Sequence, residues 1–246
     1  MMAMDYMNFG KLRKSYESGR QDYSAEVMEY IFSLMSASAK VLDVGCGTGI
    51  ATRQLAQRIS DVFGCDVDGK MIETAQGHKD SIQYHVAPTE KMPFENDVFN
   101  FVTSFGAFHW FCDEKSVSEI KRVLKSGKFF IVVNKNESGS FRKDYKRIVE
   151  KLTGAKSPQS VKVNYDPTRI LTQNGFSEVT ERKFPYVEEF TIPKAMEQIQ
   201  SMSLWNLIPE NKKRNALEIF RNHFEKSAKD GIVHRKLEIV VVNGRK

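Results

Sequence analysis

The chain has 246 residues, of which 41% are hydrophobic and 28% are charged, and its formal net charge is +6 at pH 7. This length fits one α/β domain with an elaboration, and the apolar content is sufficient for a sizeable core. No apolar run reaches membrane-spanning length, and residues 1–14 lack the hydrophobic segment of a signal peptide, so we expect a cytoplasmic protein. The modest positive charge permits contact with a polyanion, but a solvated basic surface is the simpler interpretation.

The three cysteines of the chain stand singly. Cys46, Cys65 and Cys112 form no CxxC motif and have no histidine at metal-binding spacing. They therefore predict neither a disulfide framework nor a metal site. We expect reduced thiols that pack as small apolar groups.

A tyrosine and an arginine precede the first predicted helix. Tyr16 and Arg20 stand four residues apart, ahead of a helical pattern that carries Val27, Ile31 and Leu34. Together they offer a hydroxyl and a cation that can close over a bound ligand. The alternative is that the two side chains share one helix face.

Residues 40–49 read Lys-Val-Leu-Asp-Val-Gly-Cys-Gly-Thr-Gly, which predicts a strand and a tight turn before a helix. Glycines at 45, 47 and 49 let the backbone turn sharply and let a ligand approach bare main chain. The third glycine follows the second by two positions instead of three, so the spacing differs from the dinucleotide fingerprint. Asp43 points a negative charge at the ligand, which favours a cationic amino group over a pyrophosphate. The alternative is an ordinary glycine-rich turn that binds nothing.

This segment resembles motif I of the class I S-adenosylmethionine-dependent methyltransferases. The resemblance implies S-adenosyl-L-methionine as the cofactor and S-adenosyl-L-homocysteine as its product. It also implies a set of cofactor-binding residues in the loop, namely Asp43, Gly45, Cys46, Gly47, Thr48 and Gly49.

The second predicted strand, residues 61–66, ends in an acid. Asp66 lies about 20 residues after the first glycine, where nucleotide-binding α/β domains place a carboxylate for the ribose hydroxyls. A simple turn acid is the alternative, and for Asp68 we prefer the interpretation of a helix cap. Met71 resembles the family residue that borders the adenine. Val67 and Phe105 are further expected cofactor contacts.

The third predicted strand, residues 82–86, leads into a turn that holds the adenine amino group in the family. Glu90 and the Pro-Phe pair at 93–94 match the family pattern, whereas Pro88 and Thr89 depart from it. Proline offers neither a carboxylate nor an N–H donor. We therefore expect the backbone or the Thr89 hydroxyl to make this contact.

The fourth predicted strand, residues 99–105, is followed by Gly-Ala-Phe-His-Trp-Phe. The carboxyl end of this strand is where an enzyme of this type places its reaction chemistry. Ala-x-His-Trp-Phe is similar to a segment of the trans-aconitate methyltransferase group, as is Tyr16-x-x-x-Arg20. His109 is a candidate general base or a donor to a substrate carboxylate, with Trp110 as an aromatic wall. The alternative is a histidine that hydrogen-bonds the neighbouring loop. The chain departs from the group at Gln21, Asn100, Gly106 and Cys112.

The pattern of the whole chain predicts an α/β fold. We expect a doubly wound, seven-stranded, mostly parallel Rossmann-like methyltransferase sheet, whose last strand inserts antiparallel between the fifth and sixth, with a helical cap in the C-terminal half. Apolar residues around Trp205 line this cap or form its core.

The later elements are expected at 114–124 (helix), 128–133 (strand), 141–152 and 166–176 (helices), 177–191 (strand), 193–205 and 210–229 (helices) and 237–242 (strand). As one domain, 1–246, the chain is expected to comprise a lid and helix at 1–38, the cofactor core at 39–134, cap elements at 135–230 and the final strand at 231–246.

The expected function is methyl transfer to a small-molecule carboxylic acid. A carboxylate oxygen needs no general base, so positioning by Tyr16, Arg20 and His109 is sufficient. Nucleic acid is a disfavoured partner, because the Asn/Asp-Pro-Pro-aromatic segment that grips a planar amine is replaced by Phe-Gly-Ala-Phe at 105–108. Methylation of RNA or protein and an inactive cofactor-binding homologue remain alternatives. The expected assembly is a monomer or a homodimer.

Overall fold

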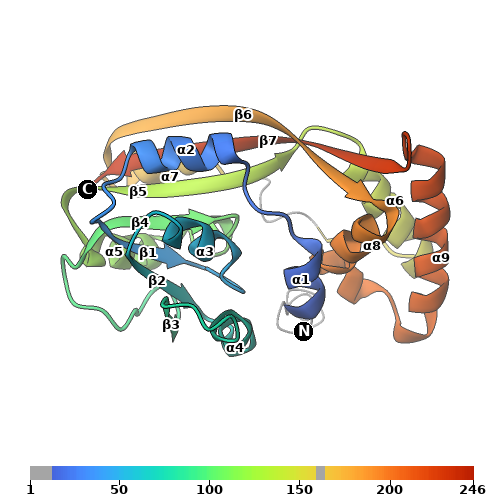
Figure 1. The fold of residues 1–246 in the computed structure, drawn as a ribbon, viewed down its shortest axis with the longest axis horizontal. Coiled ribbons are helices and arrows are strands. Elements are labelled where there is room, and N and C mark those ends of the chain that lie inside the picture. Colours follow the sequence, from blue (N-terminus) through green and yellow to red (C-terminus); the bar gives the residue numbers. More distant parts are fainter. Residues whose placement is uncertain (1–12, 159–163) are drawn as a thin grey trace. The chain divides into compact units, whose positions relative to one another are not determined.

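The computed structural model describes residues 13–158 and 164–246, which divide into two compact units (Figure 1). The unit that we call the sheet unit comprises Asp22–Lys135, Val161–Phe184 and Ile239–Lys246. The other, the helical unit, comprises Met1–Gln21, Asn136–Ser160 and Pro185–Glu238.

The sheet has the strand order β3-β2-β1-β4-β5-β7-β6 within the described residues. The first five strands are mutually parallel along this order. Reversal of the order between β1 and β4 places a switch point there, where α/β enzymes bind their ligands at the carboxyl ends of the strands. The strands are β1 (Lys40–Val44), β2 (Asp61–Asp66), β3 (Gln83–Val86), β4 (Phe99–Phe105), β5 (Leu124–Glu137), β6 (Ser177–Thr191) and β7 (Ile232–Arg245).

The last strand is antiparallel to its neighbours, as predicted. Backbone hydrogen bonds join Gly127 to Lys246 at one end of the β5–β7 pair, and Ser138 to Lys236 towards the other. Along β6, the Thr180 hydroxyl donates to Asn243 Oδ1 at 2.8 Å. β5 and β7 are longer than predicted, whereas β6 has the predicted bounds, and the residues of each of the three strands are shared between the two units.

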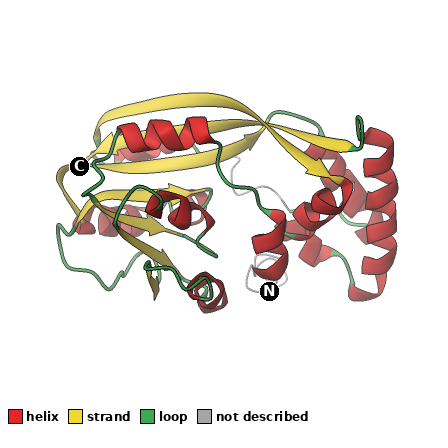
Figure 2. Cartoon of the chain, in the orientation of Figure 1, coloured by secondary structure: helices red, strands yellow, loops and turns green. Residues whose placement is uncertain are grey.

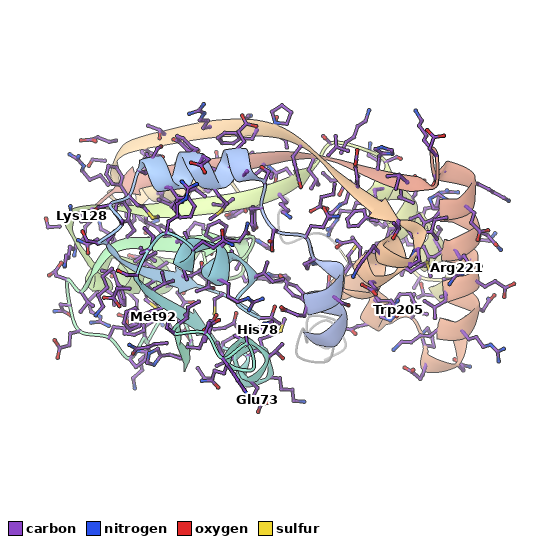
Figure 3. The ribbon with its side chains drawn as sticks, in the orientation of Figure 1. Glu73, His78, Met92, Lys128, Trp205 and Arg221 are labelled. Atoms are coloured by element: carbon purple, nitrogen blue, oxygen red, sulfur yellow. The ribbon has the colours of Figure 1, made fainter. Side chains whose placement is uncertain are left out.

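Helices cover the sheet because their apolar positions recur at helical spacing. In α5, Val117, Ile120 and Val123 are completely buried against residues of β1, β4 and β5, and Leu171 of α7 joins the same core. Met92, labelled in Figure 3, also belongs to this core. The helices of the sheet unit are α2 (Ala25–Ser33), α3 (Ile50–Ala56), α4 (Gly69–Gln76), the short 3-10 helix η3 (Phe108–Trp110), α5 (Glu114–Val123) and α7 (Pro167–Gln173).

The helical unit has a hydrophobic core of its own. Figure 2 shows the helices of this unit in red. Trp205, labelled in Figure 3, is 6% exposed and packs with Phe220 and Tyr145. This finding supports the interpretation of the predicted cap residues as core. The helices are α1 (Arg13–Gly19), α6 (Phe141–Thr153), α8 (Ile192–Gln200), the 3-10 helix η4 (Ser203–Leu207) and α9 (Glu210–Ser227).

No helix in the described part of the chain is long and apolar enough to cross a bilayer.

Candidate active site

The glycine loop after β1 has the conformation that its sequence predicts. Gly45, Gly47 and Gly49 have φ values of 69°, 56° and 80°, in the left-handed region that glycine adopts without strain. Gly45 is also closely packed, because a Cβ there would lie 2.6 Å from Ala107 Cβ and 2.8 Å from Phe111 Cε1. The segment after β4 therefore rests directly on the loop. No other residue type fits this position without displacing it.

Asp66, at the end of β2, holds the loop from one side. Its carboxylate accepts hydrogen bonds from the backbone N–H groups of Gly47 at 2.8 Å and Asp68 at 2.9 Å. Burial raises the pKa of this carboxyl, and the two N–H donors partly offset that effect. A carboxylate has about four acceptor positions, so two remain for the hydroxyls of a vicinal diol.

Asp43 is buried beneath the glycine loop. Its side chain is 1% exposed, and its two oxygens accept hydrogen bonds from the hydroxyls of Thr52 (2.8 Å) and Thr103 (2.9 Å). It therefore ties β1 to α3 and β4 beneath the loop and does not point openly at a ligand. Burial raises its pKa to about 7. Its direct contact with a cofactor stays a prediction.

Apolar side chains stand exposed at the carboxyl ends of β2 and β3. Val67 is 69% exposed and Val86 is 56% exposed, whereas Met71 is buried behind them in α4. Exposed β-branched side chains next to Asp66 suit the flat face of a nucleoside base. Of the two residues expected in the following turn, Thr89 is buried and Glu90 is exposed.

The carboxyl ends of β4 and β5 carry a group of aromatic and polar side chains. Phe105 makes an edge contact with Tyr23, with ring centroids 4.9 Å apart. The Lys135 ammonium lies 4.6 Å from the centroid of the Tyr23 ring. His109 lies against Trp110 at 4.8 Å and edge-on to Tyr165 at 5.8 Å.

A polar pair, one buried residue and one half-buried, completes this group. The amide of Asn134 and the hydroxyl of Tyr165 are in hydrogen-bond contact at 3.3 Å. Burial raises the pKa of Tyr165, so this phenol remains a neutral donor at physiological pH. Asn134 is 2% exposed, which fixes the pair in place.

Four of these side chains were not among the predicted site residues: Tyr23, Asn134, Lys135 and Tyr165. The rule that ligands lie beyond the carboxyl ends of parallel strands points to Asn134 and Lys135, which end the buried part of β5. Tyr165 carries no such signal in the sequence. Only the folding of the chain brings Tyr165 next to the other residues of the site.

Tyr16 and Arg20 belong to the helical unit, whereas all the other predicted site residues belong to the sheet unit. Within the helical unit they contact each other, with the Arg20 guanidinium 4.8 Å from the Tyr16 ring centroid. Arg20 follows the last residue of α1, so this contact is made just beyond the end of the helix. Their role in positioning a substrate stays a prediction.

The three cysteines are free thiols. Burial, reinforced by Asp66, raises the pKa of Cys46 well above its ordinary value. Among the described residues, no group of three or more His, Cys, Asp or Glu side chains is arranged to hold a metal ion.

The residues present fit an S-adenosylmethionine molecule. Main chain without Cβ atoms lines the loop, Asp66 retains free acceptor positions for a ribose, and Val67 and Val86 expose apolar surface beside it. Two acids, Asp43 and Asp66, flank the loop, and their negative charge disfavours a phosphate group.

Comparison with known proteins agrees with this geometry. Residues 42–132 match the family model described as a methyltransferase domain. An uncharacterised methyltransferase of Schizosaccharomyces pombe is 25% identical over 204 residues, which cover 80% of this chain and 79% of the relative. Several other curated methyltransferases match over about half of their own length or less.

Solved structures share the fold. A candidate type II methyltransferase of Anaeromyxobacter dehalogenans superposes with a TM-score of 0.70 at 19% identity, covering 92% of this chain and 97% of that one. Phosphoethanolamine N-methyltransferase 2 of Haemonchus contortus, in complex with phosphomonomethylethanolamine and S-adenosylhomocysteine, has a TM-score of 0.56 at 18% identity. The match covers all of this chain and 61% of that one.

The expected fold class is thereby confirmed. The methyltransferase-domain match over residues 42–132 and the methyltransferase relatives support the assignment of the chain as a class I S-adenosylmethionine-dependent methyltransferase.

Proposed function

We propose that this methyltransferase methylates a carboxylate oxygen of a small organic acid. The observation that carries the acceptor class is the group at the carboxyl ends of β4 and β5. There His109, Tyr165 and Asn134 offer N–H and O–H donors, and Lys135 adds a positive charge. An anionic acceptor suits such surroundings.

S-Adenosylmethionine, when bound, supplies an activated methyl group for an in-line substitution. The glycine loop and Asp66 hold the cofactor, with Cys46 and Thr48 as further predicted contacts. Val67, Met71, Thr89, Glu90 and Phe105 are predicted to surround its nucleoside portion.

The remaining task of the chain is to orient the acceptor and exclude water. A carboxylate brings its own lone pair, so no side chain has to remove a proton. His109 then serves as a donor that fixes the acid, with Trp110 as an apolar wall. Tyr16 and Arg20 are proposed to help position the acceptor.

Methyl transfer can be tested with the full chain, methyl-labelled S-adenosylmethionine and a panel of acids that includes trans-aconitate. We expect methyl esters, which are recognised by their release of labelled methanol in base. Small amines and RNA serve as competing acceptors in parallel reactions. Labelling of amines or RNA alone, or of no acceptor, contradicts the proposal.

Cofactor binding is tested separately with Asp66→Asn. Replacement of one carboxylate oxygen by an amide nitrogen removes acceptor capacity, so we expect about a tenfold or greater loss of S-adenosylhomocysteine affinity, or about 1.4 kcal/mol. Asp61→Asn, at the other end of the same strand, is the matched control and is expected to bind normally. Unchanged binding by Asp66→Asn removes the assigned role of this carboxylate.

A further inference from the structure

Tyr23, which comes just before α2, lies at the carboxyl end of β4. Its ring makes an edge contact with Phe105, the last residue of that strand, with the two centroids 4.9 Å apart. Its hydroxyl lies beside the next residue, because a Cβ added to Gly106 would be 3.4 Å from Tyr23 Oη. The phenol therefore points at the edge of the sheet where the reaction chemistry is expected.

Gly106 leaves room for a ligand beside this hydroxyl. It is exposed to solvent, and its φ of 67° is in the left-handed region that favours glycine. Apart from its neighbours in the chain, no other heavy atom of the described residues comes within 4 Å of its Cβ position. The lack of a side chain here keeps the approach to the Tyr23 hydroxyl open.

A cation lies on the face of the same ring. The Lys135 ammonium is 4.6 Å from the Tyr23 ring centroid, a distance at which a cation and an aromatic ring attract each other. The ring thus carries a hydroxyl donor at its edge and a positive charge on its face. Together these two groups favour an anionic acceptor.

The backbone of Tyr23 is clamped by the side chain of Gln54, in α3. The Gln54 amide accepts a hydrogen bond from the Tyr23 N–H at 2.9 Å and donates one to the Tyr23 carbonyl at 3.0 Å. Gln54 is only 8% exposed. Burial of an amide is costly unless its donor and its acceptor are both used, and here Tyr23 uses both.

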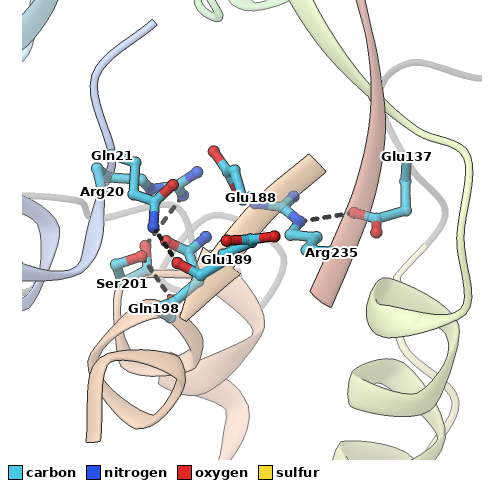
Figure 4. Close-up of polar contacts among 8 residues, drawn as sticks. All are labelled: Arg20, Gln21, Glu137, Glu188, Glu189, Gln198, Ser201 and Arg235. Carbon is cyan, nitrogen blue, oxygen red and sulfur yellow. Dashed lines mark hydrogen bonds and ion pairs between the residues drawn. The ribbon is translucent and has the colours of Figure 1, made fainter. Parts of the chain in front are cut away.

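The clamp holds Tyr23 at the start of the sheet unit. The chain passes from the helical unit to the sheet unit at Asp22. Gln21 is held within the helical unit, where its amide donates to the Glu189 carbonyl at 2.7 Å (Figure 4). Gln54 belongs to the sheet unit, as do the residues that the Tyr23 ring contacts, so the clamp sets Tyr23 among them.

We propose that the Tyr23 hydroxyl binds the carboxylate of the methyl acceptor above Gly106, and that Gln54 is the positioning residue that holds Tyr23 in place. The inference rests on the proposed function, since it names two residues that serve recognition of the acceptor class stated there. Tyr23 acts by direct contact, with Lys135 beside it. Gln54 acts only through Tyr23.

The expected kinetic signature is a change in the KM of the acid. A carboxylate loses its negative charge when it becomes an ester, so the hydroxyl and the ammonium hold the acid more tightly than the product. Binding that does not strengthen towards the transition state lowers KM without raising kcat. Tyr23→Phe, which removes only the hydroxyl, is therefore expected to raise the KM of the acid about tenfold and to lower kcat by less than about twofold.

The test measures methyl ester formation from trans-aconitate by the full chain and its variants. Gln54→Met removes both hydrogen bonds of the clamp and is expected to raise the KM of the acid about fivefold. In the Tyr23→Phe background the same substitution is expected to add less than about twofold, because the hydroxyl that Gln54 positions is already absent.

Tyr30→Phe and Gln57→Met are the matched controls. Tyr30 also carries a cation, with the Arg182 guanidinium 4.7 Å from its ring centroid, but it packs on Phe184 of β6. Gln57 is exposed at the end of α3. Both variants are expected to keep the wild-type KM of the acid.

Two results overturn the parts of this proposal. An unchanged KM of the acid in Tyr23→Phe overturns the contact of its hydroxyl with the acceptor. The role of Gln54 is overturned if Gln54→Met has the same effect with and without the Tyr23 hydroxyl, or if it weakens binding of S-adenosylhomocysteine as much as it weakens binding of the acid.

Calorimetric titration of trans-aconitate into the full chain with S-adenosylhomocysteine separates this inference from the proposed function. If the wild type makes no ester but binds the acid, and Tyr23→Phe binds it about tenfold more weakly, the proposed function fails and the Tyr23 contact stands. If esters form and Tyr23→Phe leaves the KM of the acid unchanged, the proposed function stands and the contact fails. If the acid is neither bound nor esterified, both fail.

Discussion

Asp43 is the residue whose environment most affects the behaviour of the site. Its carboxyl is fully enclosed, and burial outweighs the two threonine hydroxyls that stabilise the ionised form, so its pKa rises from 3.8 to about 7. A carboxyl with such a pKa links stability to pH near neutrality.

The sign of this linkage follows from the two proton-binding states. Below about pH 4 the carboxyl is protonated whether or not the chain is folded. Between about pH 4 and about pH 7 only the folded state keeps the proton, so the free energy of unfolding falls as pH rises. Above about pH 7 both states are ionised and the contribution no longer changes.

We therefore expect Asp43→Asn, which is neutral at every pH, to lose this dependence. The stability of the wild type minus that of the variant is expected to be greater at pH 5 than at pH 8, by about 2 kcal/mol. Urea unfolding at both pH values measures it, and Asp61→Asn, whose side chain is 48% exposed, is the control. A difference that is constant with pH contradicts the assignment of the raised pKa to Asp43.

The sequence predicted the backbone conformation of the glycine loop better than it predicted the contacts of Asp43 with distant residues. Three glycines and an acid at fixed spacing define a backbone path, so their conformations could be anticipated. The burial of Asp43 depends on Thr103, which is 60 residues away and reaches it only through the pairing of β1 with β4. Such contacts depend on register, which local patterns do not specify.

At the scale of elements, α5 shows how a helix start is encoded. Asp113 Oδ1 accepts from the backbone N–H groups of Lys115 at 3.0 Å and Ser116 at 3.1 Å, and its Oδ2 accepts from the Ser116 hydroxyl at 2.8 Å. These bonds satisfy donors that have no partner within the helix.

We expect Asp113→Ala to lower the free energy of unfolding by about 0.5–2 kcal/mol, because it removes this cap. Chemical denaturation measures the change. Lys115→Ala, at an exposed position in the same first turn, is expected to have little effect. Equal stability of Asp113→Ala and the wild type means that water satisfies these donors equally well.

Element boundaries were predictable where strong local signals set them. The strand expected at 177–191 is observed as β6 with the same bounds, and the helix expected at 114–124 is one residue shorter. The helix expected at 193–205 is instead broken into α8 and η4. The break follows Ser201, whose hydroxyl donates to the Gln198 carbonyl at 2.6 Å, and Met202 then becomes extended. A serine that closes on its own backbone competes with the helix.

At the scale of the whole molecule, the grouping of distant segments could not be predicted. The described residues 164–184, expected among the cap elements, belong to the sheet unit. The hydrogen bonds of Arg235 join it to Glu137 and Glu188, residues that share no local sequence pattern with it. Only the pairing of long strands brings them together.

Binding of S-adenosylhomocysteine is expected to stabilise the folded chain as a whole. A ligand at 100 times its Kd adds about 2.7 kcal/mol to the free energy of unfolding, and the thermal midpoint rises accordingly. We expect Gly45→Ala to lose this shift, because its Cβ collides with Ala107 and forces the loop apart.

Gly127→Ala is the matched control for this measurement. Gly127 has a φ of 70°, close to that of Gly45, but a Cβ there meets nothing within 4 Å. It carries the same backbone strain without the collision, so we expect it to lose some stability and to keep the full shift. If both variants lose the ligand-induced rise in thermal midpoint, backbone strain alone explains the loss. That result contradicts the steric argument.

The position of β7 in the sheet also determines when folding can finish. β7 lies between β5 and β6, yet its residues, Ile232–Arg245, are synthesised after both. Until the ribosome has released them, β5 has one unpaired edge and β6 has no neighbouring strand at all, and such edges recruit other chains. We therefore expect slower translation of residues 192–231 to increase aggregation of the newly made chain.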